Sequence, residues 1–214
     1  MKRLYTFFMA AALCLSSNAA TPINVVNGIS QELAVSRAAI VGNITYDLTF
    51  NIPASKTEAV KGNATITFIY KGGKTDLQLD FQGAPSQFDG LCVVNGKQIA
   101  VAWQDEHILI PRKSLRRGKN IISMSFISGD KSLNRNADYL YTLFVPEHAR
   151  SVFPCFDQPD LKALFRTRLN VPEGWETITS VSTERIPTYL FSFVAGKFSK
   201  QTQERNGRTF TALY

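Results

Sequence analysis

Residues 150–160 read R-S-V-F-P-C-F-D-Q-P-D, and the rest of the chain is organised around this stretch. Its apolar members are of types that folded proteins usually bury: Val152, Phe153, Cys155 and Phe156. Pro154 and Pro159 each fix one backbone angle and lack an N–H donor, so neither suits a central strand. We therefore expect a kinked, half-buried connection between regular elements.

Two charged residues of this stretch are expected to hold the bend. Asp157 has a short carboxylate that can accept backbone N–H bonds in a turn or cap, and Arg150 is near enough in sequence to pair with it. A strand is expected to follow at once, over Leu161–Pro172. The predicted structural corner consists of Arg150, Phe153, Pro154, Phe156, Asp157 and Pro159.

On both sides of the corner, alternating apolar and polar residues indicate strands. Residues 44–52 show the pattern most clearly, and Asn95-Gly96 between two apolar runs is typical of a tight hairpin turn. About ten such runs predict an all-β, mostly antiparallel fold, a large β-sandwich or curved double sheet. The runs are 44–52, 60–70, 77–81, 91–94, 97–103, 107–110, 120–127, 139–144, 161–172, 189–198 and 208–214, and the polar segment 132–137 between two of them is expected to be a surface loop.

The first twenty residues have the layout of a secretory signal peptide. Lys2-Arg3 precedes the apolar run 4–15, and small residues follow at 17–19. Cys14 leaves a lipoprotein as the alternative, but Leu13 stands before it where a small residue is needed. The apolar run is too short to span a bilayer. We therefore predict a signal peptide over 1–19, no transmembrane segment, and an exported chain that is periplasmic or secreted.

The segment after the signal peptide, 20–43, is expected to hold a loose lead and one short helix. Ser30 can cap that helix, Glu32 lies in its first turn, and Gly42-Asn43 is expected to end it. Residues 44–214 then form the β-domain. Its last strand has no closing turn or polar tail after it, so we expect this domain to be truncated at its C-terminal end.

The amino-acid composition is typical of a packed domain, and the distribution of charge gives no sign of a nucleic-acid partner. Apolar residues make up 44% and charged residues 19%, with a net charge of +7. The basic run 112–119 is short; it can touch an anionic surface, but a solvated turn between strands is favoured. The chain has no interleaving of aromatic and basic residues that would predict nucleic-acid binding. Cys92 and Cys155 lie inside apolar runs, which favours two buried free thiols, although export would permit a disulfide.

The longer pattern R-x-V-F-P-C-F-D-Q-P-D-x-K-A-x-F, which runs from Arg150 to Phe165, resembles a signature of aminopeptidase N-like zinc metallopeptidases. These are gluzincins with an H-E-x-x-H motif. The resemblance covers roughly 28–214 and implies the N-terminal β-domain of a secreted enzyme that removes N-terminal residues from peptides. It also implies that this fragment is a scaffold that lines the substrate site and is inactive alone.

The zinc chemistry of that family lies outside these 214 residues. It needs two histidines one helical turn apart, with a glutamate between them as base. His107 and His148 are far apart, neither begins H-E-x-x-H, and the family's G-x-M-E-N stretch is also absent. We expect both to be ordinary surface or satisfied histidines. The resemblance therefore implies no cofactor in this chain, zinc in a full-length parent, and a missing catalytic domain as the partner through which peptide substrates are bound.

The family's N-terminal domain contributes a glutamine or glutamate that meets the substrate's α-amino group. Counting back from the corner puts that position on Val145, with Leu143 two residues before it. Either Glu147 takes over through a shifted loop, or the amine is recognised differently. Tyr141 and Phe144 can line a side-chain pocket or pack in the core. The candidate substrate contacts are thus Tyr141, Phe144, Val145 and Glu147.

A free-standing β-sandwich that binds carbohydrate or protein is the alternative function. Exposed aromatic triplets would support it, and no clear aromatic platform is visible in the sequence. The two hypotheses differ in what the exposed side chains of the β-domain are for.

Overall fold

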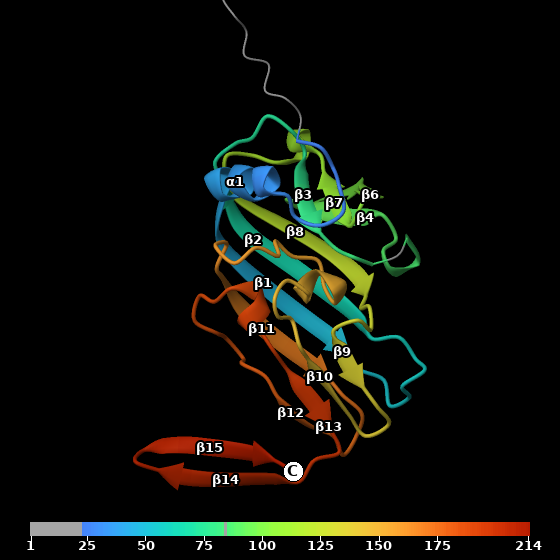
Figure 1. The fold of residues 1–214 in the computed structure, drawn as a ribbon, viewed down its shortest axis with the longest axis vertical. Coiled ribbons are helices and arrows are strands. Elements are labelled where there is room, and N and C mark those ends of the chain that lie inside the picture. Colours follow the sequence, from blue (N-terminus) through green and yellow to red (C-terminus); the bar gives the residue numbers. More distant parts are fainter. Residues whose placement is uncertain (1–22, 84) are drawn as a thin grey trace, which may run out of the picture.

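The structure is a computed structural model that describes residues 23–83 and 85–214 (Figure 1). The predicted signal peptide, 1–19, lies outside the described residues. The largest sheet has six strands in the order β11-β1-β2-β8-β4-β5. Their bounds are β11 Ala163–Asn170, β1 Val41–Asn51, β2 Lys61–Tyr70, β8 Gly118–Ile127, β4 Leu91–Val94 and β5 Lys97–Ala100.

Three smaller sheets complete the fold. A four-stranded sheet has the order β12-β13-β10-β9, a three-stranded sheet the order β3-β7-β6, and β14 pairs with β15. Their bounds are β12 Glu176–Ile178, β13 Val194–Gly196, β10 Tyr139–Thr142, β9 Leu133–Arg135, β3 Leu77–Asp80, β7 His107–Ile110, β6 Ala102–Gln104, β14 Lys200–Arg205 and β15 Arg208–Leu213. The prediction of an all-β fold is confirmed.

The core lies between the six-stranded sheet and the four- and three-stranded sheets, and the β14–β15 hairpin adds no residue to it. The period of two places one side chain in two on the inner face of β1, β2 and β8. Rings then meet across the layers: Phe50 of β1 lies 4.8 Å from Phe193 beside β13, and Phe126 of β8 lies 6.0 Å from Phe81 after β3. The outer face of the same strands carries polar residues, including Thr65, whose hydroxyl lies 2.9 Å from that of Ser123.

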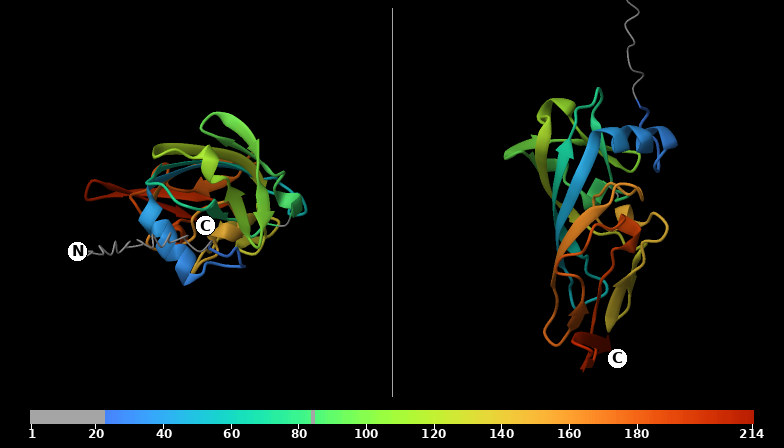
Figure 2. Two further views of the ribbon diagram at one scale, coloured as in Figure 1. Left: turned by 90° about the horizontal axis from the view of Figure 1, so that it is seen from above. Right: turned by 90° about the vertical axis from the view of Figure 1, so that its left-hand side faces the viewer.

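Figure 1 shows the long strands side by side, with helix α1 (Gln31–Ile40) at one end and the β14–β15 hairpin at the other. The side view in Figure 2 agrees with this elongated arrangement. Ser30 caps α1 as predicted, since its Oγ accepts the N–H of Leu33 at 3.1 Å. The helix does not end in a turn at Gly42-Asn43, because β1 begins directly at Val41 and absorbs Asn43 in an irregularity of its pairing with β2.

Several predicted strands differ from the observed ones. Residues 189–198 form no single strand, because Pro187 begins a 3-10 turn at Thr188–Leu190 before β13. The expected loop 132–137 contains β9, which finds a pairing partner in β10. Residues 97–103 divide between β5 and β6, which belong to different sheets. The remaining 3-10 turns are Pro85–Gln87, Arg112–Ser114 and Ala149–Ser151.

The sheets are mostly antiparallel, as expected, but β11 runs parallel to β1 along eight paired positions. This pairing places Phe165 beside Tyr46, with ring centroids 5.0 Å apart. The corner at residues 150–160 delivers the chain to β11. A tight turn cannot make a parallel pair, so a long crossover must precede β11.

Candidate functional site

The corner lies in the middle of the core. The expectation that it is half-buried was wrong, because residues 151–158 are all buried and only Pro159 and Asp160 reach solvent. Phe153 is enclosed by five aromatic rings that it meets edge to face, at centroid distances of 5.8–6.5 Å. This arrangement suits the ring quadrupoles and buries the whole side chain. Those rings are Tyr46, Phe50, Phe144, Phe165 and Phe191.

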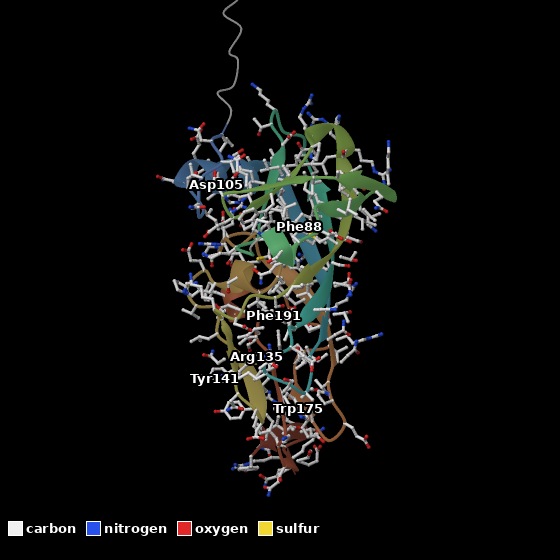
Figure 3. All side chains as sticks on the ribbon, turned by 90° about the vertical axis from the view of Figure 1, so that its right-hand side faces the viewer. Phe88, Asp105, Arg135, Tyr141, Trp175 and Phe191 are labelled. Atoms are coloured by element: carbon white, nitrogen blue, oxygen red, sulfur yellow. The ribbon has the colours of Figure 1, made fainter. Side chains whose placement is uncertain are left out.

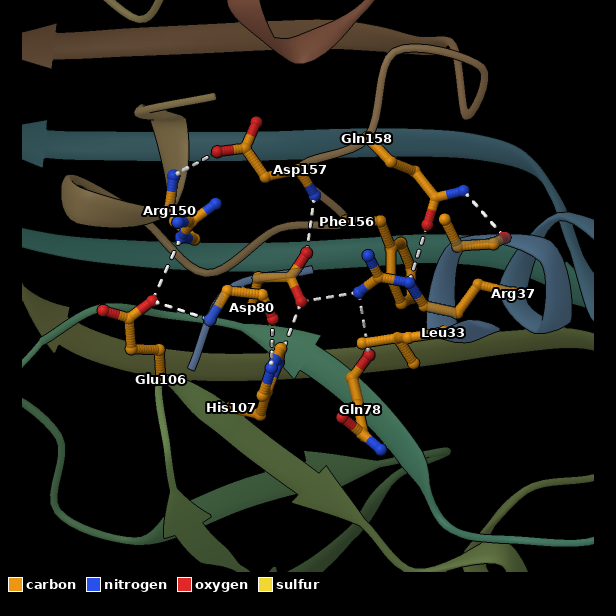
Figure 4. Close-up of polar contacts among 12 residues, drawn as sticks. Leu33, Arg37, Gln78, Asp80, Glu106, His107, Arg150, Phe156, Asp157 and Gln158 are labelled. Carbon is orange, nitrogen blue, oxygen red and sulfur yellow. Dashed lines mark hydrogen bonds and ion pairs between the residues drawn. The ribbon is translucent and has the colours of Figure 1, made fainter. Parts of the chain in front are cut away.

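Asp80 of β3 is the centre of a buried polar network beside the corner (Figure 4). Its Oδ1 lies 2.6 Å from Arg37 Nη1 and 2.9 Å from His107 Nδ1, and its Oδ2 accepts the N–H of Asp157 at 2.8 Å. Burial alone would raise the pKa of Asp80, but Arg37 and His107 outweigh it and hold that pKa below its usual value. The carboxylate therefore stays ionised inside the protein.

Asp157 fixes the bend itself. Its Oδ2 accepts the backbone N–H of Arg150 at 3.0 Å, and its Oδ1 accepts the hydroxyl of Thr188 at 2.6 Å. Burial raises the pKa of Asp157, and these two hydrogen bonds oppose the rise without cancelling it. The predicted pairing with Arg150 holds for the backbone alone. The guanidinium lies instead 3.4 Å from Glu106 and 3.3 Å from Glu147.

Helix α1 is bound to this network by one arginine. Arg37 is buried, donates from Nε to Gln158 Oε1 at 2.7 Å, and lies over the ring of Phe156. Gln158 in turn donates to the carbonyl of Ala34 at 3.1 Å. The sequence patterns did not predict the roles of Arg37, Asp80 and Gln158. The signal available for Arg37 was its spacing of four residues from the buried Leu33, which places it on the covered face of the helix.

The segment just before the corner exposes a row of apolar side chains. Tyr139 and Tyr141 of β10 are 39% and 44% exposed, and the row continues beyond the strand with Leu143 at 57% and Val145 at 52%. Alternate residues point the other way, so Phe144 is buried against Phe153 and Phe191. Figure 3 shows Tyr141 at the edge of the molecule near Arg135, while Phe191 lies further inside.

The predicted substrate contacts are therefore not one group of exposed residues. Tyr141, Val145 and Glu147 reach solvent, while Phe144 packs in the core. Glu147 is half-exposed and lies within ion-pair distance of Arg150. The chain thus presents one face of residues 139–147 to solvent and uses the other face as core.

Neither histidine is placed for zinc. His107 is buried, with Nδ1 against Asp80 and Nε2 2.9 Å and 3.0 Å from the carbonyl oxygens of Gly28 and Val26. Over residues 23–83 and 85–214, no group of three histidine, cysteine, aspartate or glutamate side chains is arranged to hold a metal ion. Zinc needs such a converging set, so the residues described here do not fit it.

Cys92 and Cys155 are free and buried, as predicted. Burial raises the pKa of the Cys92 thiol to about 12, and it raises that of Cys155 as well. Neither thiol is therefore available as a nucleophile at neutral pH. Across the described part of the chain, no helix has the length and apolar character needed to cross a membrane.

A family model, curated relatives and solved structures all point to the same family. Residues 128–190, which span β10, the corner and β11, match the model of the peptidase M1 N-terminal domain. Aminopeptidase N of Streptomyces lividans is 26% identical over 207 residues, which cover 85% of this chain and 24% of the relative. The chain contains an M1 peptidase N-terminal domain. A probable M1 family aminopeptidase 2 of Encephalitozoon cuniculi is 33% identical over 117 residues, 40% of this chain and 13% of that protein.

The fold of this M1 N-terminal domain also has a solved counterpart. An M1 zinc metallopeptidase from Deinococcus radiodurans superposes with a TM-score of 0.61 over 77% of this chain and 44% of its own, at 19% identity. The chain spans about a quarter or less of the length of the curated relatives named above. Within the matched segment the corner is buried, and Asp80 of β3 accepts a hydrogen bond from it at Asp157.

Proposed function

We propose that this chain serves as the N-terminal domain of an exported zinc aminopeptidase that removes N-terminal residues from peptides. The observation that carries the proposal is the corner signature, which lies within the segment matched by the M1 family and is buried as one unit with Asp80 and Arg37. Zinc and the residues that bind it belong to the catalytic part of such an enzyme. The role of this domain is to support and line the substrate site.

The exposed face of residues 139–147 is the proposed lining. It lies directly on the corner, so Tyr141 and Val145 are held by a segment that packing and hydrogen bonds fix in place. Glu147 is engaged by Arg150 at 3.3 Å, which reduces its availability for a substrate amine. This contact favours the second of the two alternatives, in which the substrate amine is recognised by another group. Phe144 supports this face from the core side.

A domain exchange tests the proposal. The corresponding part of Streptomyces lividans aminopeptidase N would be replaced by residues 28–214 of this chain, with a deletion of the same part as the comparison. We expect the chimera to bind stoichiometric zinc and to release amino acids from aminoacyl-anilides with chelator sensitivity, and the deletion to lack this activity even when zinc is bound. A folded, zinc-loaded chimera that is no more active than the deletion would overturn the supporting role.

The isolated chain provides the second arm. With or without added zinc, the purified protein should release no amino acid from aminoacyl-anilides, because its described residues present no metal-binding group. Chelator-sensitive turnover by the 214-residue protein would contradict the proposal.

Export has its own test. Mass spectrometry of the protein from culture fluid or periplasm should find a start near Ala20, as the layout of residues 1–19 predicts. Recovery of the exported protein with Met1 intact would rule out signal cleavage.

A further inference from the structure

The exposed tyrosines of β10 belong to an aromatic row that the sequence did not reveal. The ring of Tyr139 lies 6.4 Å from that of Tyr141 with planes 25° apart, and 6.0 Å from that of Phe198 with planes 31° apart. Phe198 follows β13, so the row crosses from one strand to its neighbour. Three nearly parallel rings in series thus form an extended apolar strip at the surface.

Polar side chains surround one end of this strip. A hollow of about 420 Å³ is bounded by Tyr139 and Tyr141 together with Lys56, Asp130, Asn134 and Asn136. Among the described residues, Lys56 and Asn134 have no side-chain hydrogen bond or ion pair. The side-chain Oδ1 of Asn136 accepts the backbone N–H groups of Asp138 and Tyr139, both at 2.8 Å, which leaves the side-chain NH₂ group as a donor.

The hollow is preformed by Arg135. Its guanidinium donates to the backbone carbonyls of Ser55 and Glu58 at 3.2 Å and 3.0 Å, which fixes the loop carrying Lys56 against β9. The same side chain lies 3.6 Å from Asp130. A binding surface that is already in place loses less conformational entropy when a ligand arrives.

We propose that this aromatic row and the adjoining hollow bind an uncharged oligosaccharide. A pyranose ring has apolar C–H faces that stack on aromatic rings and hydroxyl groups at its rim that need hydrogen-bond partners. The row supplies successive stacking surfaces, and Asp130, Asn134 and Asn136 supply acceptors and donors beside them. A pocket for a peptide side chain would be lined mainly by apolar atoms, whereas this one is bordered by amide, carboxylate and ammonium groups.

This site shares Tyr141 with the proposed lining of the substrate site, but its ligand class and its test do not depend on the proposed function. It requires the exposed rings of β10, Phe198 and the polar residues of the hollow, and no zinc chemistry. An aminopeptidase domain with this site would hold its parent near a polysaccharide or a glycosylated peptide. Loss of sugar binding would leave the role of the corner intact, and failure of the domain exchange would leave the sugar site intact.

Affinity electrophoresis of the purified 214-residue protein tests the site. Native gels would contain hydroxyethylcellulose, laminarin, xylan or glycol chitin, with a gel without polysaccharide as reference. We expect retardation by at least one polysaccharide, and a loss of roughly tenfold or more in affinity in the Tyr139→Thr/Tyr141→Thr variant, since ring stacking is the main apolar contact. Phe210→Thr, which removes an exposed ring from β15, should bind as the unmodified protein does.

Two results would overturn the proposal. One is the absence of retardation in every polysaccharide gel, and the other is retardation that persists unchanged in the double threonine variant. Circular dichroism of each variant shows that it is folded, and Asn134→Ala provides a second variant that keeps the aromatic row. Asn134→Ala should weaken the shift, because Asn134 borders the hollow, and an unchanged shift would remove the hollow from the site. An equal loss in Phe210→Thr would assign the binding to the hairpin instead.

Discussion

Residues 139–145 and residues 150–158 are neighbours in the sequence, but the tyrosines of the first are exposed whereas the phenylalanines of the second are buried. In the first segment, Tyr139 and Tyr141 stack at the surface, and Leu143 and Val145 are more than half exposed. In the second, Phe153 and Phe156 are fully enclosed, and the charged Asp157 is bonded on both oxygens. Burial of one aromatic cluster fixes the backbone, and that fixed backbone presents the other cluster to solvent.

The largest change in stability is expected for a substitution at Phe153. Phe153→Ala should lower the free energy of unfolding by about 3–5 kcal/mol, because it removes a buried ring that five others enclose. Urea unfolding followed by tryptophan fluorescence measures the change. A loss below about 1 kcal/mol would mean that the corner is not the packed centre described here.

The next largest loss of stability is expected for a substitution at Asp80. Asp80→Asn should cost about 3 kcal/mol, since it leaves the buried Arg37 without its anionic partner. Glu32→Gln, a carboxylate on the exposed side of α1, is the matched control and should stay within about 0.5 kcal/mol. Equal changes in the free energy of unfolding for the two substitutions would show that the buried network does not stabilise the fold.

The same carboxylate gives a pH dependence with a definite sign. The pKa of Asp80 is lower in the folded protein than in the unfolded chain, so its contribution is present at neutral pH. That contribution is lost as the pH falls from roughly 4, near the pKa of aspartate in the unfolded chain, through the lower pKa of the folded protein. In this range the unfolded chain takes up the proton at a higher pH than the folded protein does. Unfolding curves between pH 7 and 2 should therefore show a steeper acid loss in the unmodified protein than in Asp80→Asn. The opposite order would contradict the assignment.

Sequence patterns predicted the corner better than the surface row, for a physical reason. Prolines, apolar residues and a short carboxylate restrict the backbone locally, so residues 150–160 could be interpreted without knowing their neighbours. The network around Asp80 joins β3, β7 and α1, and such distant pairings leave no periodic trace. The aromatic row likewise depends on Phe198, which comes from a segment that was predicted as one continuous strand.

The same limit applies to strand pairing. Alternation indicated β1, β2 and β8 correctly, but it carries no information on direction, so the parallel partner β11 was not predicted. The candidate substrate contacts were chosen by position relative to the corner. That position placed Tyr141 and Val145 at the surface and Phe144 in the core, because successive residues of an extended chain face opposite sides.

Chemical modification should distinguish the exposed aromatic row from the buried corner and its core neighbours without any mutation. Tetranitromethane is expected to modify Tyr139 and Tyr141 in the native protein and to leave Tyr46 unmodified, since Tyr46 is buried and burial raises its pKa. The thiol of Cys155 at the corner should likewise remain unlabelled by a disulfide reagent at pH 8 until the protein unfolds. Peptide mapping by mass spectrometry locates each modification. Native labelling of Cys155 at the rate of an unfolded control would show that the corner opens to solvent.

The smallest effect is expected at the surface row. Tyr141→Thr keeps a β-favouring residue in β10 and removes a ring that is 44% exposed, so the free energy of unfolding should change by less than about 1 kcal/mol. The partly covered half of the ring and its contact with Tyr139 account for a small loss. Chemical denaturation of Tyr141→Thr beside Phe153→Ala makes the comparison direct. A loss as large as that of Phe153→Ala would mean that the row is part of the core, and it would also remove the reason to assign that row to a ligand.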